Sequence, residues 1–104
     1  MFVETLTIVV NEGFSDQVVA RFSKEGAVEK SNGFLDLSVL VKKASKGEEE
    51  VIVLIRWESK AHWKEWEMSD AHIQGHKRSR EQGRPEYILR SHSSVYEVKA
   101  IKTA

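Results

Sequence analysis

VIVLIRW, at residues 51–57, is the stretch that decides the fold, because a nearly unbroken apolar run of this length predicts a buried β-strand. Apolar residues occur at both parities of the run, so both faces of the strand are expected to be covered. The preceding residues 34–41 alternate between apolar and polar side chains, and residues 44–47 (Ala-Ser-Lys-Gly) supply a turn. The two runs therefore predict a β-hairpin.

Further strands and helices are predicted on both sides of this hairpin. Residues 2–10 are rich in β-branched and apolar side chains and predict a first strand, after which Ser15 is placed to cap a helix. Behind the hairpin, Ser59 can cap a second helical region, and Ser69 can cap its continuation. Arg84-Pro85 closes this region, and the residues from 87 to 98 predict a last, long strand.

The predicted order of elements is β-α-β-β-α-β, which is the split pattern of the ferredoxin-like α+β fold. Both helical regions would then cover one face of a four-stranded antiparallel sheet and leave the other face open. Because residues 51–57 are apolar on both faces, we expect a second copy of the chain to cover the open face, which predicts a homodimer. The chain is 104 residues long and shows no linker or repeat, so residues 1–104 are expected to form one domain.

Composition excludes several classes of function. Sixteen basic residues balance sixteen acidic ones, and the one basic cluster, residues 77–84, lacks interleaved aromatics, so we expect no nucleic-acid partner. The absence of cysteine rules out disulfides, thiolate metal sites and a cysteine nucleophile, and it suits a cytoplasmic location. The first residues do not build a signal peptide, and no apolar run approaches membrane-spanning length, so no membrane contact is expected.

Chemistry-bearing side chains concentrate between residues 62 and 76, which hold two of the three tryptophans and three of the four histidines. Trp63 and Trp66 lie at a spacing that also suits plain core aromatics. His72 and His76 are four residues apart and would share a helix face, where they could chelate zinc, although no H-E-x-x-H pattern supports such a site. A serine hydrolase and a phosphate-binding loop are not favoured either, because neither a G-x-S-x-G elbow nor a clustered glycine loop is present.

Two segments resemble the Isd-type heme-degrading branch of the antibiotic-biosynthesis-monooxygenase superfamily. The first, residues 55–60 (IRWESK), ends the third strand with a W-x-S-[KE] pattern. The second runs from Trp66 through Ser69-Asp70 to His76, and this combination is much more specific than W-x-S. Arg21-Phe22 and Gly33-Phe34 also look like the family, so the resemblance extends over nearly the whole chain.

This resemblance implies a dimeric α+β barrel in which each subunit holds heme between its helices and its sheet. The chain would act as a monooxygenase that uses O2 and electrons from an external reductase to open the heme ring and release iron. By position, His76 looks like the ligand of the heme iron, and Trp66 looks like the bulky residue that distorts the ring. An imidazole is a standard iron ligand, and a rigid indole resists a flat ring better than a flexible side chain does.

Three further site residues follow from the resemblance. The best known members carry an Asn on the first strand, and the nearest position in this sequence is Thr5, whose hydroxyl is a shorter donor. Arg21, or the basic cluster Lys77, Arg78 and Arg80, can meet the heme propionates, and Phe22 can line the pocket or fill the core. Two alternatives stay open: a heme carrier that turns its cofactor over poorly, and a cofactor-free monooxygenase acting on a quinol or polyketide.

Overall fold

The computed structural model describes residues 1–43 and 46–104, so Ala44 and Ser45 of the predicted turn lie outside the described residues. Eight elements follow one another along the chain: β1 (Phe2–Asn11), α1 (Ser15–Ser23), η1 (Val28–Lys30), β2 (Phe34–Lys43), β3 (Glu48–Trp57), α2 (Lys60–Glu67), α3 (Asp70–Gln82) and β4 (Ile88–Glu97). This order confirms the predicted ferredoxin-like α+β fold. The short 3-10 helix η1 was not predicted, and the second helical region is divided into α2 and α3.

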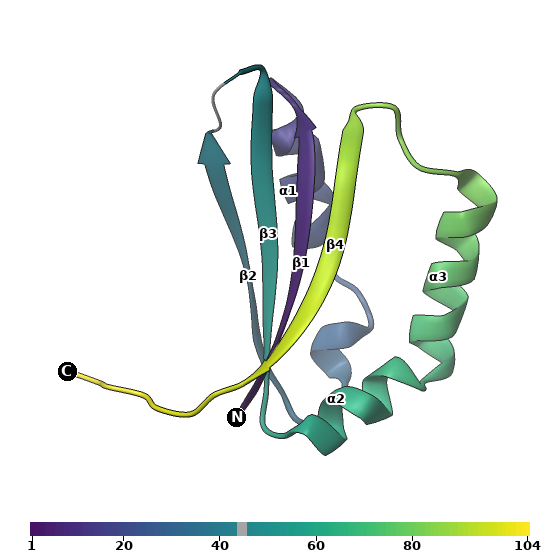
Figure 1. Cartoon of the computed structure of the whole chain (residues 1–104). Helices are drawn as coiled ribbons and strands as arrows, with labels where there is room; N and C mark the ends of the chain where they lie inside the picture. Colours follow the sequence, from purple (N-terminus) through teal and green to yellow (C-terminus); the bar gives the residue numbers. More distant parts are fainter. Residues whose placement is uncertain (44–45) are drawn as a thin grey trace.

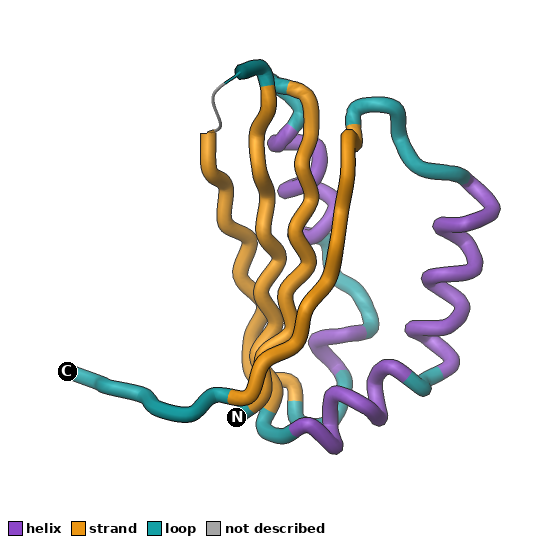
Figure 2. Tube along the Cα trace, in the orientation of Figure 1, coloured by secondary structure: helices purple, strands orange, loops and turns teal. Residues whose placement is uncertain are grey.

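The four strands form one antiparallel sheet in the order β2-β3-β1-β4 (Figures 1 and 2). The two central strands, β1 and β3, are therefore the first strand and the apolar run that the sequence singles out. In the middle of the sheet, Leu6 of β1 lies opposite Val53 of β3 on one side and Ser93 of β4 on the other. These residues share one face of the sheet, because side chains of paired residues point the same way.

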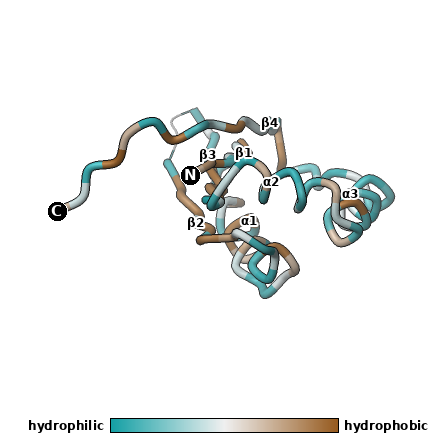
Figure 3. Tube along the Cα trace, turned by 90° about the horizontal axis from the view of Figure 1, so that it is seen from below, coloured by the Kyte–Doolittle hydropathy of each residue, from teal (hydrophilic) through white to brown (hydrophobic). Residues whose placement is uncertain are grey.

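The core lies between this face and α1. Its buried residues come from three strands and one helix: Ile8, Val10, Val18, Val51 and Ile88. In β1 the core residues are even-numbered, so the odd-numbered positions face away from the helices. Figure 3 shows α1 and α3 on the same side of the sheet, with α3 displaced beyond β4.

Helix caps were predicted with mixed success. Ser59 accepts a hydrogen bond from the amide of His62 at 3.3 Å, and Ser69 accepts one from the amide of His72 at 3.2 Å, which confirms both caps. The predicted cap at Ser15 is wrong, because Ser15 is the first helical residue and no side chain of the N-cap bonds the helix. The carboxylate of Glu49 on β3 accepts from the Ser15 amide instead, at 3.3 Å.

The helix α3 stands away from the sheet (Figure 1), and none of its residues is buried. The prediction that the helices cover one face of the sheet is therefore confirmed for α1, which packs against the core. The helix α3 lies over the same face but does not pack tightly against it. Within the described ranges, no helix is long and apolar enough to cross a membrane.

Candidate functional site

A cleft of about 580 Å³ lies between the sheet and the helices that stand over it. Its floor is formed by side chains from the helix-facing side of the strands: Glu4, Leu6, Leu37, Val53, Ile55 and Ser93. Its walls come from the three helices and η1: Arg21, Phe22, Val28, Trp66, Glu67, His72, Gly75, His76 and Ser79. The cleft brings together four of the five residues that the sequence singles out, and the fifth, Thr5, is not among its lining residues.

The junction between α2 and α3 places the aromatic and imidazole groups at the cleft. The hydroxyl of Ser69 accepts a hydrogen bond from the amide of His72 and donates one to the carbonyl of Trp66 at 2.6 Å. This single side chain ties the end of α2 to the beginning of α3. As a result, the rings of Trp66 and His72 meet edge to face, with 5.2 Å between their centroids.

His72 and His76 form a hydrogen-bonded pair on the cleft side of α3. Their Nε2 atoms are 3.1 Å apart, and their ring centroids are 4.4 Å apart. The pair alone offers a metal ion only two nitrogens, because the described residues hold no group of three or more histidine, cysteine or acidic side chains able to bind one. Structural zinc requires four ligands and catalytic zinc three, so the two-histidine zinc hypothesis lacks its remaining ligands.

A half-buried carboxyl group lies at the floor of the cleft. Burial and the nearby carboxylate of Glu67 raise the pKa of Glu4, while the indole N–H groups of Trp63 and Trp57 act in the opposite direction. Within the described chain, Glu4 Oε1 and both indole nitrogens are buried without a hydrogen-bond partner of normal geometry. An acid of this kind retains its proton to higher pH than a surface carboxyl does, and it can then donate a hydrogen bond.

Arg21 and Phe22 occupy the other wall of the cleft, on α1. The guanidinium of Arg21 lies over the ring of Phe22, with 5.3 Å from its central carbon to the ring centroid. Phe22 is half-buried and packs against the core as well, so both roles considered for it are present together. Arg21 is exposed and can reach an anionic group at the mouth of the cleft.

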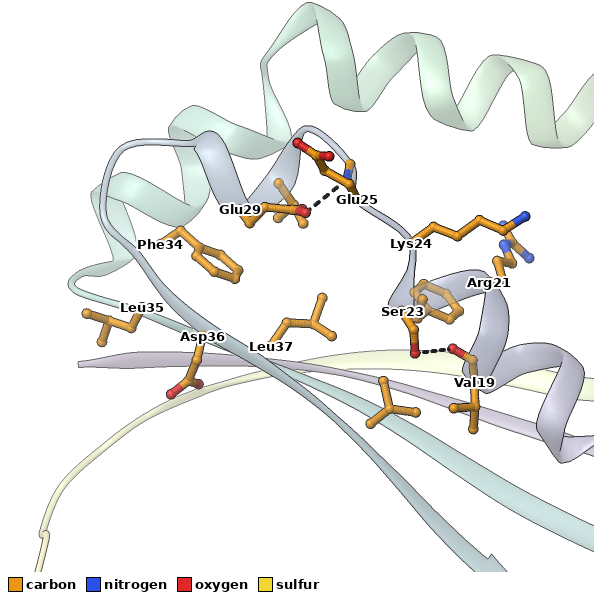
Figure 4. Close-up of a pocket in the computed structure, with 14 residues that line it drawn as sticks. Val19, Arg21, Ser23, Lys24, Glu25, Glu29, Phe34, Leu35, Asp36 and Leu37 are labelled. Carbon is orange, nitrogen blue, oxygen red and sulfur yellow. Dashed lines mark hydrogen bonds between the residues drawn. The ribbon is translucent and has the colours of Figure 1, made fainter.

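A second hollow of about 760 Å³ lies between α1, η1 and β2. Figure 4 shows Phe34 and Leu37 directed into this hollow from β2, with Arg21 and Lys24 at its far end. Its lining includes three carboxylates, Glu25, Glu29 and Asp36, but neither a histidine nor a tryptophan. Although it is larger, it therefore offers less chemistry than the cleft.

Thr5 lies on the opposite face of the sheet from the cleft. Its neighbours Glu4 and Leu6 both line the cleft, and side chains alternate along a strand. The structure thus brings a leucine and a carboxyl group, not the Thr5 hydroxyl, to the helix-facing side of β1. Sequence reasoning also missed Ser93, which lies beside Leu6 on β4. The even parity of the buried residues Ile8 and Val10 is the signal that could have placed these side chains.

Comparison with known proteins identifies relatives of the whole chain. The model of the family described as antibiotic biosynthesis monooxygenase matches residues 1–78. The heme-degrading monooxygenase HmoA of Bacillus subtilis is 50% identical over 102 residues, which cover 98% of this chain and 94% of HmoA. A heme-degrading monooxygenase of Halalkalibacterium halodurans is 39% identical over 102 residues, covering 98% of this chain and 85% of that protein.

A solved structure resembles the chain as well. It is the heme degrader MhuD of Mycobacterium tuberculosis with two hemes bound in its active site. MhuD is 27% identical to this chain, with a TM-score of 0.71, and the match covers 99% of this chain and 100% of MhuD. The similarity therefore extends over the elements that build the cleft, including α2 and α3.

Proposed function

The chain belongs to the antibiotic biosynthesis monooxygenase family, and from this membership we propose that it is a heme-degrading monooxygenase, with heme as the substrate of the cleft. The observation that carries the proposal is that Trp66 and His76 line one cleft between the helices and the sheet. Relatives named heme-degrading monooxygenases that match almost the whole chain, one of them at 50% identity, support it.

The cleft suits a large, flat, mostly apolar ligand with anionic edges. Its volume of about 580 Å³ lies within the range of about 300 to 1,000 Å³ that is usual for small-molecule sites. Leu6, Val53 and Ile55 give it an apolar floor, while Arg21 stands at its wall. A porphyrin needs such a slot, because its ring is hydrophobic and its two propionates are charged.

We assign the iron bond to His76. Its imidazole reaches the cleft from α3, and neutral imidazole is a common ligand of heme iron. A single axial nitrogen is enough for heme, in contrast to a bare zinc ion, so the missing third ligand does not weigh against this assignment.

Trp66 would press against the bound ring and resist its planar form. The indole is half-buried and is held from one side by the His72 ring and from the backbone by the Ser69 hydroxyl. A rigid indole restrained in this way yields less to an entering ring than a flexible side chain would. Arg21, and Lys77 and Arg80 on α3, would pair with the propionates.

Bound heme would supply both the iron at which O2 reacts and the ring that is oxidised, with electrons arriving from an external donor. On this chain's side, Glu4 and Ser93 are the polar groups of the floor that can direct hydrogen bonds into the cleft. They take the place that the sequence suggested for Thr5. The reductase that delivers the electrons is expected in a reducing compartment, in keeping with a chain that has no cysteine.

We further propose that the open face of the sheet is covered by a second copy of the chain. Ile52 and Leu54 of β3 share the parity of this face, and so do Leu40 and Tyr96, which are 48% and 55% exposed. Exposed apolar side chains on an open sheet face favour a protein partner, and an isologous dimer is the commonest arrangement.

A hemin titration tests the proposal. We expect the Soret band to saturate at one heme per subunit, and to decay with release of ferrous iron when ascorbate and catalase are added under air. His76→Ala should weaken hemin binding and change the spectrum of the complex, while a surface variant outside the cleft and the open sheet face, Gln17→Ala on α1, should leave both unchanged. Failure of the protein to bind hemin would refute the proposal.

A heme carrier is the second candidate, favoured by the absence of an amide donor from β1 at the cleft. In that case hemin binds through His76, but the Soret band persists under the same reducing conditions. The cofactor-free alternative predicts instead that His76→Ala leaves the oxidation of an organic substrate unaffected.

A further inference from the structure

The position of the protons in the histidine pair follows from its hydrogen bonds. The Nδ1 atom of His72 lies 3.1 Å from the carbonyl oxygen of Glu67, which can only accept, so Nδ1 carries the proton. In a neutral His72 ring the Nε2 atom is then a bare acceptor. The hydrogen bond of 3.1 Å between the two Nε2 atoms therefore has His76 as its donor.

The surroundings of His72 hold its ring in the orientation in which Nε2 accepts the hydrogen bond from His76. Its side chain is only 17% exposed, it meets the Trp66 ring edge to face, and the Glu67 carboxylate lies 3.4 Å from the same Nδ1 atom. His76, in contrast, is exposed and has no other side-chain partner among the residues that the structure describes. The hydrogen bond from His76 to His72 is thus the interaction that directs the His76 ring.

We propose that His72 competes with heme iron for Nε2 of His76 and so lowers the affinity of the protein for heme. This inference rests on the proposed role of His76 as the iron ligand. Iron needs the lone pair of Nε2, so the proton must move from this nitrogen to Nδ1 of the same ring, and the hydrogen bond to His72 must break. His72 is therefore a positioning residue of the ligand-free state, not a ligand itself.

The sign of the effect follows from linkage. An interaction that stabilises only the ligand-free form weakens binding, because it must be given up when the ligand enters. A neutral hydrogen bond changes an equilibrium by roughly two- to tenfold, and solvent exposure places this one at the lower end. Removing the acceptor at position 72 should therefore tighten hemin binding by roughly two- to fivefold.

Two variants of similar size isolate the acceptor. In His72→Gln the amide oxygen can still accept from His76, whereas in His72→Leu no acceptor remains. Metal-free protoporphyrin IX is the matched probe, because it touches the same walls but cannot bond to His76. We expect the ratio of hemin affinity to protoporphyrin affinity to rise two- to fivefold in His72→Leu and to stay near the wild-type ratio in His72→Gln.

The ligand-free protein offers a readout that does not involve heme. Two-bond ¹H–¹⁵N correlation spectra at about pH 8, where imidazole is neutral, should show His72 protonated on Nδ1 and His76 on Nε2. In His72→Leu the His76 signals should move to those of a water-exposed ring. An affinity ratio that is equal in His72→Leu and wild type, or a wild-type His76 protonated on Nδ1, would overturn the inference.

Failure of the proposed function is recognised separately. If His76→Ala leaves the hemin spectrum unchanged, His76 is not the iron ligand and no competition with iron exists. The spectra of the ligand-free protein would then still report whether the hydrogen bond between the two histidines is present.

Discussion

Gly33 supports the helix that carries Trp66, and its replacement by alanine should be unusually destabilising. The residue has a φ of +78°, and a Cβ atom built there would lie 2.2 Å from Cγ of His62. His62 lies one turn before Trp66 in α2, and its Nδ1 atom bonds the hydroxyl of Ser59 at 2.8 Å. Alanine at position 33 would therefore displace a ring that is fixed at the beginning of α2.

Two effects make up the expected loss of stability. The left-handed backbone conformation costs about 1 kcal/mol for a residue other than glycine. Displacing His62 breaks its hydrogen bond with Ser59 and disturbs the packing of its ring against residue 33, which together cost about 1 to 3 kcal/mol more. Gly33→Ala should thus lower the free energy of unfolding by about 2 to 4 kcal/mol.

Gly47→Ala is the control. Gly47 has nearly the same φ, +77°, but a Cβ atom there has no neighbour within 4 Å in the described chain. Its replacement should cost only the backbone share, about 1 kcal/mol. Urea unfolding followed by tryptophan fluorescence measures both variants. The reasoning is refuted if the two lose the same stability, or if adding His62→Ala to Gly33→Ala restores none of the difference.

Four further predictions concern the cleft and the fold. Trp66→Ala should keep the hemin Kd within a few-fold but slow Soret decay at least about tenfold, in a single-turnover assay. The pKa of Glu4 is raised, so its protonated form is favoured in the folded state and stability should fall as pH rises above about 4.5. In urea unfolding, Glu4→Gln should remove this part of the slope. Glu49 has a lowered pKa because the amides of Gly13 and Ser15 bond its carboxylate. The destabilisation by Glu49→Gln should accordingly shrink as pH falls below about 4.5. Amides of α3 should exchange with solvent faster than those of β1, and hemin should slow them.

The fold could be predicted from the sequence because its strongest signals act over short distances. The run at residues 51–57 is apolar on both faces, and it became the central strand β3. Serines at positions 59 and 69 cap the helices that follow them, because a side-chain oxygen next to a free amide is a local interaction. The cap predicted at Ser15 is wrong because the interaction there is not local. The partner of the Ser15 amide is Glu49 on β3, which is 34 residues away in sequence.

The site was predicted in part. Trp66 and His76 line the cleft as expected. Thr5 was assigned to the site without asking which face of the sheet its side chain points to. Because side chains alternate along a strand, a shift by one residue moves a side chain to the other face. The pairing of His72 with His76 could be expected from their spacing, but its hydrogen-bond direction depends on the Glu67 carbonyl and needs the structure.

The position of α3 is the feature that no local pattern predicts. The helix has few apolar residues, so little burial draws it onto the sheet, and it is held mainly through the Ser69 junction with α2. A helix placed in this way leaves apolar floor residues such as Leu6 and Ile55 only half-covered. Under the proposed function, we expect a flat apolar ligand to complete the packing between α3 and the sheet, so that the weak core on this side of the molecule makes room for the substrate.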